Sequence, residues 1–316
     1  VLDSRELGAD GDYFLFGGNS LNAMETLSLL EPAVGRRLKI SDLYACRTAR
    51  QLDAWLTGGA AQEAPAALPP IPRAPEREAY PLSEIQKSIS PQCRMAPEST
   101  AYNMPGVFRL GAKPDRTALE RAFGSLIELD DIYRTAFVFE NGGLCGKIMP
   151  KADFTLTELY GDSLGEVWHG FLKPFDLARP PLIRAGIWSR EDESLLFIDV
   201  HHIVGDGVST PLMLKRLNAL YCGGELPPPE LTYKDYCVWR EGGGDDSAGL
   251  EAWKKHLLPL PEKLDMPADL TRPHPFDFKG GVCEFTLPDE LAARCDSFCA
   301  ERELTPFMLF SAAWGL

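Results

Sequence analysis

The sequence predicts two folded parts, a small all-α bundle at the N-terminus and a larger mixed α/β lobe after it. Three observations support this division. Apolar residues recur at helical spacing within residues 1–58. Residues 59–78 are rich in Ala and Pro, a composition that favours extended, semi-rigid backbone and cannot form a core. From residue 79 onward, apolar runs typical of strands alternate with helical patterns.

Composition limits the classes of function. The 316 residues carry a formal net charge of −14. This acidic surplus disfavours nucleic acid as a partner, because phosphate binding needs a positive footprint. No apolar run approaches the ~20 residues of a membrane helix, and no secretory signal opens the chain. We therefore expect a cytoplasmic protein with no membrane association and no nucleic-acid partner.

The cysteines give no metal signature. There are eight, most of them widely scattered, and the closest pair is Cys295 and Cys299 on a predicted helix. Structural zinc sites usually need a second pair of ligands at short spacing, and none is present. We expect ordinary thiols in a reducing compartment and no metal site.

The N-terminal part, residues 1–58, is predicted to be a short helical bundle that begins inside its first helix. Leu21, Met24, Leu27 and Leu30 recur at the spacing of one helix face. The segment Thr48–Gln51 has the pattern of a capping box, in which each end residue's side chain meets the other's backbone N–H. A further helix is expected after this box.

The second part is predicted to comprise a lobe over residues 79–265 and the start of another over residues 266–316. Strands are expected at 107–110, 136–139, 194–200 and 281–287. Helices are expected at 115–129, after Gly207, at 289–303 and at 306–316. The run at 194–200 is nearly continuously apolar, as in a strand buried on both faces. It delivers two adjacent histidines, His201 and His202, at its end.

The first chemically informative segment is Asp12-Tyr-Phe-Leu-Phe-Gly-Gly-Asn-Ser-Leu21. Ser20 follows two glycines and opens a predicted helix, whose positive N-terminal end favours an anion. Ser20 as a plain helix N-cap is the simpler alternative. The segment resembles the attachment motif of carrier proteins. That resemblance implies that Ser20 carries 4′-phosphopantetheine, added by a phosphopantetheinyl transferase.

The second segment is His201-His-Ile-Val-Gly-Asp-Gly207. It resembles the HHxxxDG signature of the condensation domains of non-ribosomal peptide synthetases, which have a chloramphenicol-acetyltransferase-like α/β fold. Further segments resemble that family's motifs in the right order: Tyr80–Gln86, Tyr133–Phe137, Pro174–Leu177, Pro181–Arg184 and Tyr233–Trp239. Two positions depart from the family: Ser88 stands where Arg is usual, and Tyr133 stands where Leu is usual.

The resemblance implies a role for each residue of the signature. His202 would contact the α-amine of the acceptor, either as a general base or by orienting it. His201 would be structural. Asp206 would pair with Arg134 and hold the loop, and Gly207 would leave room where the pantetheine arms meet.

The resemblance also implies a reaction and partners. Ser20 would carry an aminoacyl or peptidyl thioester, and the amine of an aminoacyl group on a downstream acceptor carrier would attack it. Positioning supplies much of the rate, because thioesters are already activated. An upstream adenylation domain would load Ser20, in a pathway that makes an antibiotic or a siderophore. The resemblance also implies that most of the second lobe is absent, so we expect the piece as written to be inactive.

Two alternatives remain open. An epimerisation domain shares the fold and the HHxxxDG signature and also follows a carrier, although Thr210-Pro211-Leu212 and the Tyr233–Trp239 segment favour condensation. A non-catalytic relative that recruits partner enzymes is the second alternative, although such domains usually lose the histidines. A heterocyclising relative would carry aspartates in place of the histidines.

Overall fold

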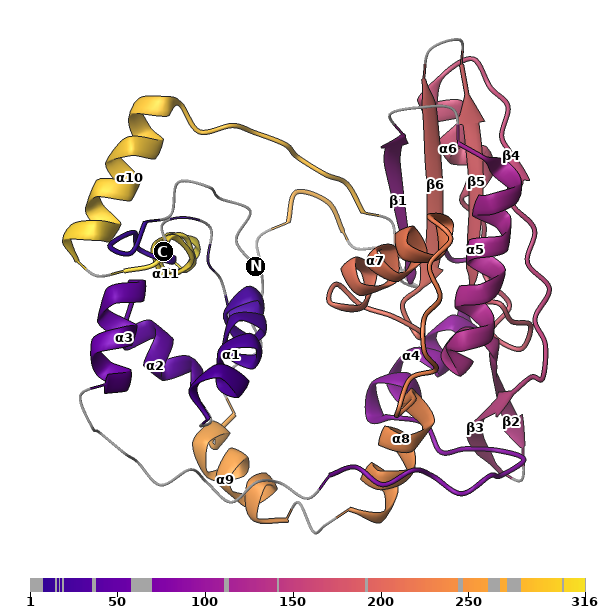
Figure 1. The fold of residues 1–316 in the computed structure, drawn as a ribbon, viewed down its shortest axis with the longest axis horizontal. Coiled ribbons are helices and arrows are strands. Elements are labelled where there is room, and N and C mark those ends of the chain that lie inside the picture. The colour runs from indigo at the N-terminus through magenta and orange to yellow at the C-terminus, as the bar shows by residue number, and fades with distance from the viewer. Residues whose placement is uncertain are drawn as a thin grey trace. The chain divides into compact units, whose positions relative to one another are not determined.

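The computed structural model describes most of the chain in two compact units (Figure 1). One unit comprises residues 1–69 with 281–316, and the other comprises residues 70–280. The described residues are 8–14, 16, 18, 20–35, 38–57, 70–110, 114–140, 142–190, 193–243, 247–260, 268–271, 280–302 and 304–315. Within these ranges every helix is too short or too polar to cross a bilayer. The predicted first-helix remnant (1–7) and linker residues 59–69 lie outside them.

The predicted helical bundle is observed in the first unit. Its helices are α1 (Ser20–Val34), α2 (Ile40–Ala45) and α3 (Ala49–Thr57). They share a core whose buried members are Tyr13, Phe14, Ala23, Leu27, Leu38, Leu43, Cys46 and Leu52. The predicted capping box opens α3: the backbone N–H of Gln51 donates to Thr48 Oγ1, and that of Thr48 donates to Gln51 Oε1, both at 3.2 Å.

The same unit contains α10 (Asp289–Glu301) and α11 (Pro306–Trp314). Their bounds agree closely with the helices predicted at 289–303 and 306–316. The strand expected at 281–287 is wrong: this segment has no strand structure, and Val282 and Phe285 are 87% and 82% exposed. A strand needs a neighbour to satisfy its backbone N–H and C=O groups. None of the strands in the described residues pairs with this segment.

The larger unit is built on a four-stranded sheet with the order β1-β6-β5-β4. Its strands are β1 (Asn103–Leu110), β4 (Thr157–Glu158), β5 (Ile183–Ser189) and β6 (Ser194–His201). β6 lies antiparallel to both β1 and β5, whereas β4 lies parallel to β5. The histidine strand is therefore central, as its apolar composition predicts.

Side chains of β6 alternate between two cores, one on each face of the sheet. Leu196, Ile198 and Val200 belong to the main core, which includes α5 (Arg116–Leu129). Leu195 and Phe197 belong to a smaller core with residues of α6 (Leu164–Phe171). All eight residues of β6 are buried, so the prediction of a strand covered on both faces is confirmed.

The larger unit also contains a hairpin, a 3₁₀ turn and further helices outside the sheet. A two-stranded hairpin joins β2 (Thr135–Glu140) to β3 (Gly143–Ile148). A 3₁₀ turn, η1 (Asp131–Arg134), precedes this hairpin. The remaining helices are α4 (Glu84–Met95), α7 (Ser209–Tyr221), α8 (Tyr233–Gly242) and α9 (Ser247–Leu257). The helices predicted at 115–129 and after Gly207 correspond to α5 and α7.

Candidate functional site

The first histidine of the pair, His201, is the last residue of β6 and is buried, with 3% of its surface exposed. Its Nδ1 accepts a hydrogen bond from the backbone N–H of Ile203 at 3.1 Å. An imidazole that accepts at Nδ1 carries its proton at Nε2 when neutral. Nε2 lies 3.5 Å from Cys93 Sγ, which then acts as the acceptor. The ring therefore fixes the turn that follows the strand.

The surroundings of His201 oppose its protonation. Burial lowers the pKa of His201 to about 4, with further lowering from the neighbouring His202 and the Arg184 guanidinium. Phe175 contacts the ring edge-on, with 5.9 Å between ring centroids. A neutral, enclosed imidazole of this kind positions backbone and does not exchange protons with a substrate near pH 7.

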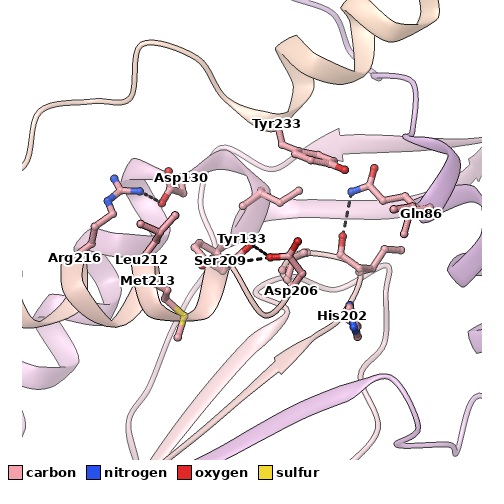
Figure 2. Close-up of a pocket in the computed structure, with 15 residues that line it drawn as sticks. Gln86, Asp130, Tyr133, His202, Asp206, Ser209, Leu212, Met213, Arg216 and Tyr233 are labelled. Carbon is pink, nitrogen blue, oxygen red and sulfur yellow. Dashed lines mark hydrogen bonds and ion pairs between the residues drawn. The ribbon is translucent and has the colours of Figure 1, made fainter. Parts of the chain in front are cut away.

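His202, the second histidine, is exposed. Its backbone N–H donates to the carbonyl of Tyr102 at 2.8 Å, which ties the residue to the segment just before β1. It lines an open pocket of about 320 Å³ beside the end of β6 (Figure 2). Adjacent histidines thus have opposite surroundings, and only the second is available to a ligand.

Asp206 organises the loop between His202 and α7. Its Oδ1 accepts from the backbone N–H of Val208 at 3.0 Å, and from the N–H and hydroxyl of Ser209 at 2.7 and 2.6 Å. The bonds from the side chain and backbone of Ser209 hold the pKa of the Asp206 carboxyl below its usual value. The dashed lines that end at Asp206 in Figure 2 mark its contacts with Ser209.

The predicted pair between Asp206 and Arg134 is wrong. Arg134 donates instead to three backbone carbonyls: Nε to Ile127 at 3.0 Å, Nη1 to Met149 at 2.7 Å and Nη2 to Glu128 at 3.3 Å. The carbonyls of Ile127 and Glu128 lie at the end of α5, where a helix lacks donors and favours a cation, and that of Met149 follows β3. Asp206 is already satisfied by Val208 and Ser209, so each residue is structural on its own.

Gly207 stands in an open place. A Cβ built there would meet no atom within 4 Å, and the residue does not adopt positive φ. Neither packing nor backbone conformation within the described residues therefore requires a glycine here.

The pocket beside His202 combines an apolar wall with polar groups that already have partners. The apolar members include Ile85, Ile132, Leu212 and Met213. Gln86 donates through Nε2 to the carbonyl of Ile203 at 3.1 Å, and a dashed line from Gln86 marks this bond in Figure 2. This bond explains why Gln86, a member of the Tyr80–Gln86 motif, matters: α4 holds the residue that follows His202.

The sequence analysis assigned no role to Asp130, Tyr133 or Arg216, which line this pocket. Arg216 of α7 forms an ion pair with Asp130, and Tyr133 lies on the adjoining 3₁₀ turn. A pair 86 positions apart leaves no local pattern to read. The Tyr133 signal was present, because the sequence departs from the family's leucine there.

The carrier motif is positioned by a network around Tyr13. Its hydroxyl lies 2.8 Å from Thr26 Oγ1 and donates to Asn22 Oδ1 at 3.2 Å, so it holds the first two turns of α1. Its backbone N–H donates to the carbonyl of Arg47 at 2.7 Å. Ser20 is the first residue of α1, where a helix N-terminus favours a phosphate; its side chain lies outside the described part of the structure.

Gly18 has a role beyond access to the serine. A Cβ at Gly18 would overlap the ring and the carbonyl oxygen of Tyr13. The Gly18 N–H donates to that same carbonyl at 2.9 Å. The glycine thus permits the turn to close on Tyr13 just before Ser20.

Comparison with protein-family models gives two matches along the chain. Residues 76–316 match the Condensation domain model, and residues 2–56 match the Phosphopantetheine attachment site model. The chain belongs to the condensation-domain family. An attachment-site domain precedes that domain in the order that the motifs predict, so the recognition of a carrier and a condensation domain of a non-ribosomal peptide synthetase is confirmed.

Curated relatives match nearly the whole chain. One of the plipastatin synthases of Bacillus subtilis (strain 168) is 35% identical over 321 residues, covering 99% of this chain and 12% of that protein. Surfactin synthase subunit 2 of the same organism is 31% identical over 315 residues, covering 98% of this chain and 9% of that protein. The chain thus spans about a tenth of the length of these relatives.

Solved structures agree on the fold of the condensation part. The X-domain in complex with OxyB from teicoplanin biosynthesis matches with a TM-score of 0.58 and 24% identity, over 65% of this chain and 49% of that one. The first condensation domain of the calcium-dependent antibiotic synthetase, bound to a substrate analogue, matches with a TM-score of 0.51 and 20% identity, over 58% and 48%. The chloramphenicol-acetyltransferase-like fold predicted from the motifs is therefore confirmed.

Proposed function

We propose that this chain is the donor carrier and the catalytic-histidine lobe of a peptide-bond-forming condensation unit, with His202 at the reaction centre. The observation that carries this proposal is the contrast between the two histidines. His201 is sealed and held neutral, whereas His202 is exposed at the edge of an open pocket. The loop that presents His202 is held by hydrogen bonds to the side chains of His201, Gln86 and Asp206.

In the proposed reaction the acceptor's α-amine attacks the carbonyl carbon of the donor thioester. A new N–C bond forms, the C–S bond breaks, and the leaving thiolate of the donor arm takes up the proton that the amine loses. His202 accepts a hydrogen bond from the amine and orients its lone pair toward the thioester. Gly207 lies in open space and leaves room for the two arms to meet.

The phosphopantetheine attachment is proposed at Ser20. The attachment-site match covers this residue, and Ser20 opens α1 at the end of the Tyr13–Gly18 turn. When bound, the group supplies a flexible arm with a thiol that carries the acyl group. The residues of this chain fit it through the N–H groups at the start of α1, which favour the phosphate.

The partners and limits follow from this role. We propose an upstream adenylation domain, a phosphopantetheinyl transferase and a downstream acceptor carrier, and domain limits of 1–58, 59–78, 79–265 and 266–316. The family matches at 2–56 and 76–316 support the separation of the carrier from the condensation part. Eight free thiols support a reducing location such as the cytoplasm.

Two measurements test the proposal in sequence. The protein is incubated with coenzyme A and a broad phosphopantetheinyl transferase, and its intact mass and peptides are mapped. One arm on Ser20, absent in Ser20→Ala, is the expected result. No arm on the folded protein would leave Ser20 as a helix cap and overturn the carrier role.

Amide formation is then followed in the full-length protein with a loaded donor and acceptor. We expect His202→Ala to lower the rate by about 10²–10⁴-fold, the range for a positioned acid–base group. Inversion of the donor's α-carbon without amide formation would identify epimerisation instead. An unchanged rate in His202→Ala would remove this residue from the reaction centre.

A further inference from the structure

The pocket beside His202 has few polar groups left for a ligand. Tyr233 donates its hydroxyl to Ser83 Oγ at 3.1 Å, and Gln86 is bound to the carbonyl of Ile203. Arg216 is paired with Asp130. These side chains line the pocket, but their polar groups already have partners within the protein. Selection of a bound group by polar contact then depends on the side chains that have no such partner.

Tyr133 is such a residue. It lines the pocket from η1, only 6% of its surface is exposed, and its backbone N–H donates to the carbonyl of Asp130 at 3.2 Å. Its hydroxyl has no hydrogen-bond partner within the described ranges. It is also not among the unpartnered atoms that are sealed from solvent, which belong to Asn103, Arg184, Glu193 and Asp199. The hydroxyl therefore meets open space.

An unpartnered tyrosine hydroxyl at such depth is unusual, because buried Tyr O–H groups usually find an acceptor. Burial raises the pKa of Tyr133 to about 12; the charge of Asp130 adds to this rise, and Arg216 opposes it. The phenol is thus protonated at any physiological pH and acts as a donor. Asp130 and Arg216 line the same pocket as Tyr133, so the charges that act on the phenol belong to the pocket wall.

The sequence makes this donor a particular feature of the chain. Tyr133 precedes Arg134 and Thr135 in the motif where the family usually has Leu. A leucine here would complete an apolar wall with Ile132, Leu212 and Met213. The tyrosine keeps a similar apolar body but adds a donor to that wall.

We propose that the Tyr133 hydroxyl donates a hydrogen bond to an oxygen atom of the thioester-bound substrate in the pocket beside His202, and so contributes to substrate binding. This proposal rests on the proposed function. The oxygen belongs to the aminoacyl side chain or to the arm and thioester that every substrate shares. In the first case Tyr133 discriminates between substrates, and in the second it contributes equally to the binding of all of them.

The experiment compares wild type with Tyr133→Phe and Tyr133→Leu in the full-length protein. Ser20 is loaded from leucyl- or asparaginyl-coenzyme A, and the acceptor is the leucyl or asparaginyl thioester of N-acetylcysteamine. Leucine and asparagine side chains have nearly the same shape, so their difference reports the oxygen. A melting temperature is recorded for each variant. Tyr133→Phe should melt no lower than wild type, because the hydroxyl has no hydrogen-bond partner among the described residues.

We expect Tyr133→Phe to lower kcat/KM by about tenfold, the effect of one lost hydrogen bond to substrate. A loss confined to one asparaginyl substrate assigns the oxygen to that side chain. An equal loss for all substrates, at unchanged melting temperature, assigns it to the arm or thioester. Equal kcat/KM for wild type and Tyr133→Phe with every substrate overturns the proposal.

A binding measurement separates this inference from the proposed function. Calorimetry with non-reactive leucyl and asparaginyl pantetheine amides compares wild type with Tyr133→Phe without any turnover. If wild type makes no amide, the proposed function fails, while weaker binding to Tyr133→Phe still supports the inference. Equal binding of both amides to both proteins overturns the inference whatever the reaction proves to be.

Discussion

The imidazole Nδ1 of His201 accepts the backbone N–H of Ile203 at 3.1 Å, and this bond spans the residue that we place at the reaction centre. Only a neutral ring can accept at Nδ1, because both ring nitrogens of a protonated histidine are donors. The bond therefore ties the shape of the His201–Ile203 turn to the protonation state of a buried group.

A first prediction concerns the pH dependence of stability. The pKa of His201 is lowered from its ordinary 6.5 to about 4, chiefly by burial. Above pH 6.5 the ring is neutral in both folded and unfolded chains, so its contribution is complete. As pH falls from 6.5 toward 4, the unfolded chain binds a proton that the folded chain refuses, and stability is lost. We expect a loss of about 2 kcal/mol between pH 7 and pH 5 from this group.

Urea unfolding of wild type and His201→Asn at both pH values measures this term. The asparagine oxygen accepts from Ile203 without titrating, so the variant should lose about 2 kcal/mol less over this interval. His169→Asn, on the exposed surface of α6, serves as the control and should follow wild type. Equal pH dependence in His201→Asn and wild type would contradict the neutral, buried His201.

A second prediction concerns Arg134 and Asp206. Arg134→Met removes the donor to two carbonyls at the end of α5 and to that of Met149 after β3, so we expect it to destabilise the lobe by about 1–3 kcal/mol. Asp206→Ala removes the acceptor for the start of α7, with an expected cost of about 1 kcal/mol. Because the two side chains have separate partners, a double-mutant cycle should show coupling below about 0.5 kcal/mol. Coupling well above that value would restore the ion pair expected from the sequence.

A third prediction concerns the turn before Ser20. Gly18→Ala places a methyl group into the Tyr13 ring and carbonyl, so we expect a loss of about 1–3 kcal/mol in carrier stability. The displaced turn should also slow arm attachment at Ser20. Gly8→Ala is the matched control, since a Cβ there meets no atom within 4 Å. Normal attachment to a normally stable Gly18→Ala protein would show that the closed turn is not needed.

Much of the architecture could be predicted because its causes are local. The apolar run 194–200 dictates a central strand, and Thr48 and Gln51 carry a cap within four residues. The expected strand at 281–287 failed for the opposite reason. Its alternation is a local preference, but a strand exists only where another strand offers its backbone, and no described strand pairs with it.

In the candidate site, too, local features could be predicted and long-range contacts could not. The motifs located both histidines, Asp206 and Arg134, yet the partner of each came from the three-dimensional arrangement. Arg134 is satisfied by carbonyls, which are present at every position and leave no signature in a sequence. Tyr133 shows the reverse: its departure from the family is visible in the sequence, but a role for it emerges only because its hydroxyl has no hydrogen-bond partner in the part of the chain that the structure describes.

The final prediction concerns Asp235, the aspartate of the Tyr233–Trp239 motif. It is 4% exposed, and its carboxylate accepts two backbone N–H groups at 2.7 Å: that of Thr232 at the start of α8, and that of Ala74 in the segment before the lobe. One side chain thus caps a helix and fastens residues that the sequence assigned to a linker. Burial opposes its charge, but the bonds from Thr232 and Ala74 outweigh it, and the pKa of Asp235 is lowered.

Asp235→Ala removes both acceptors, so we expect the lobe to lose about 2–4 kcal/mol. The Ala74 amide should exchange with solvent about tenfold faster or more, because its bond to a carboxylate is gone. Hydrogen exchange read by mass spectrometry over residues 70–79 measures this release. Asp153→Ala, which removes an exposed carboxylate paired with Lys151, is the control and should leave that segment unchanged. If Asp235→Ala lowers stability while the 70–79 segment keeps its protection, the aspartate serves only as the cap of α8, and other contacts hold the linker to the lobe.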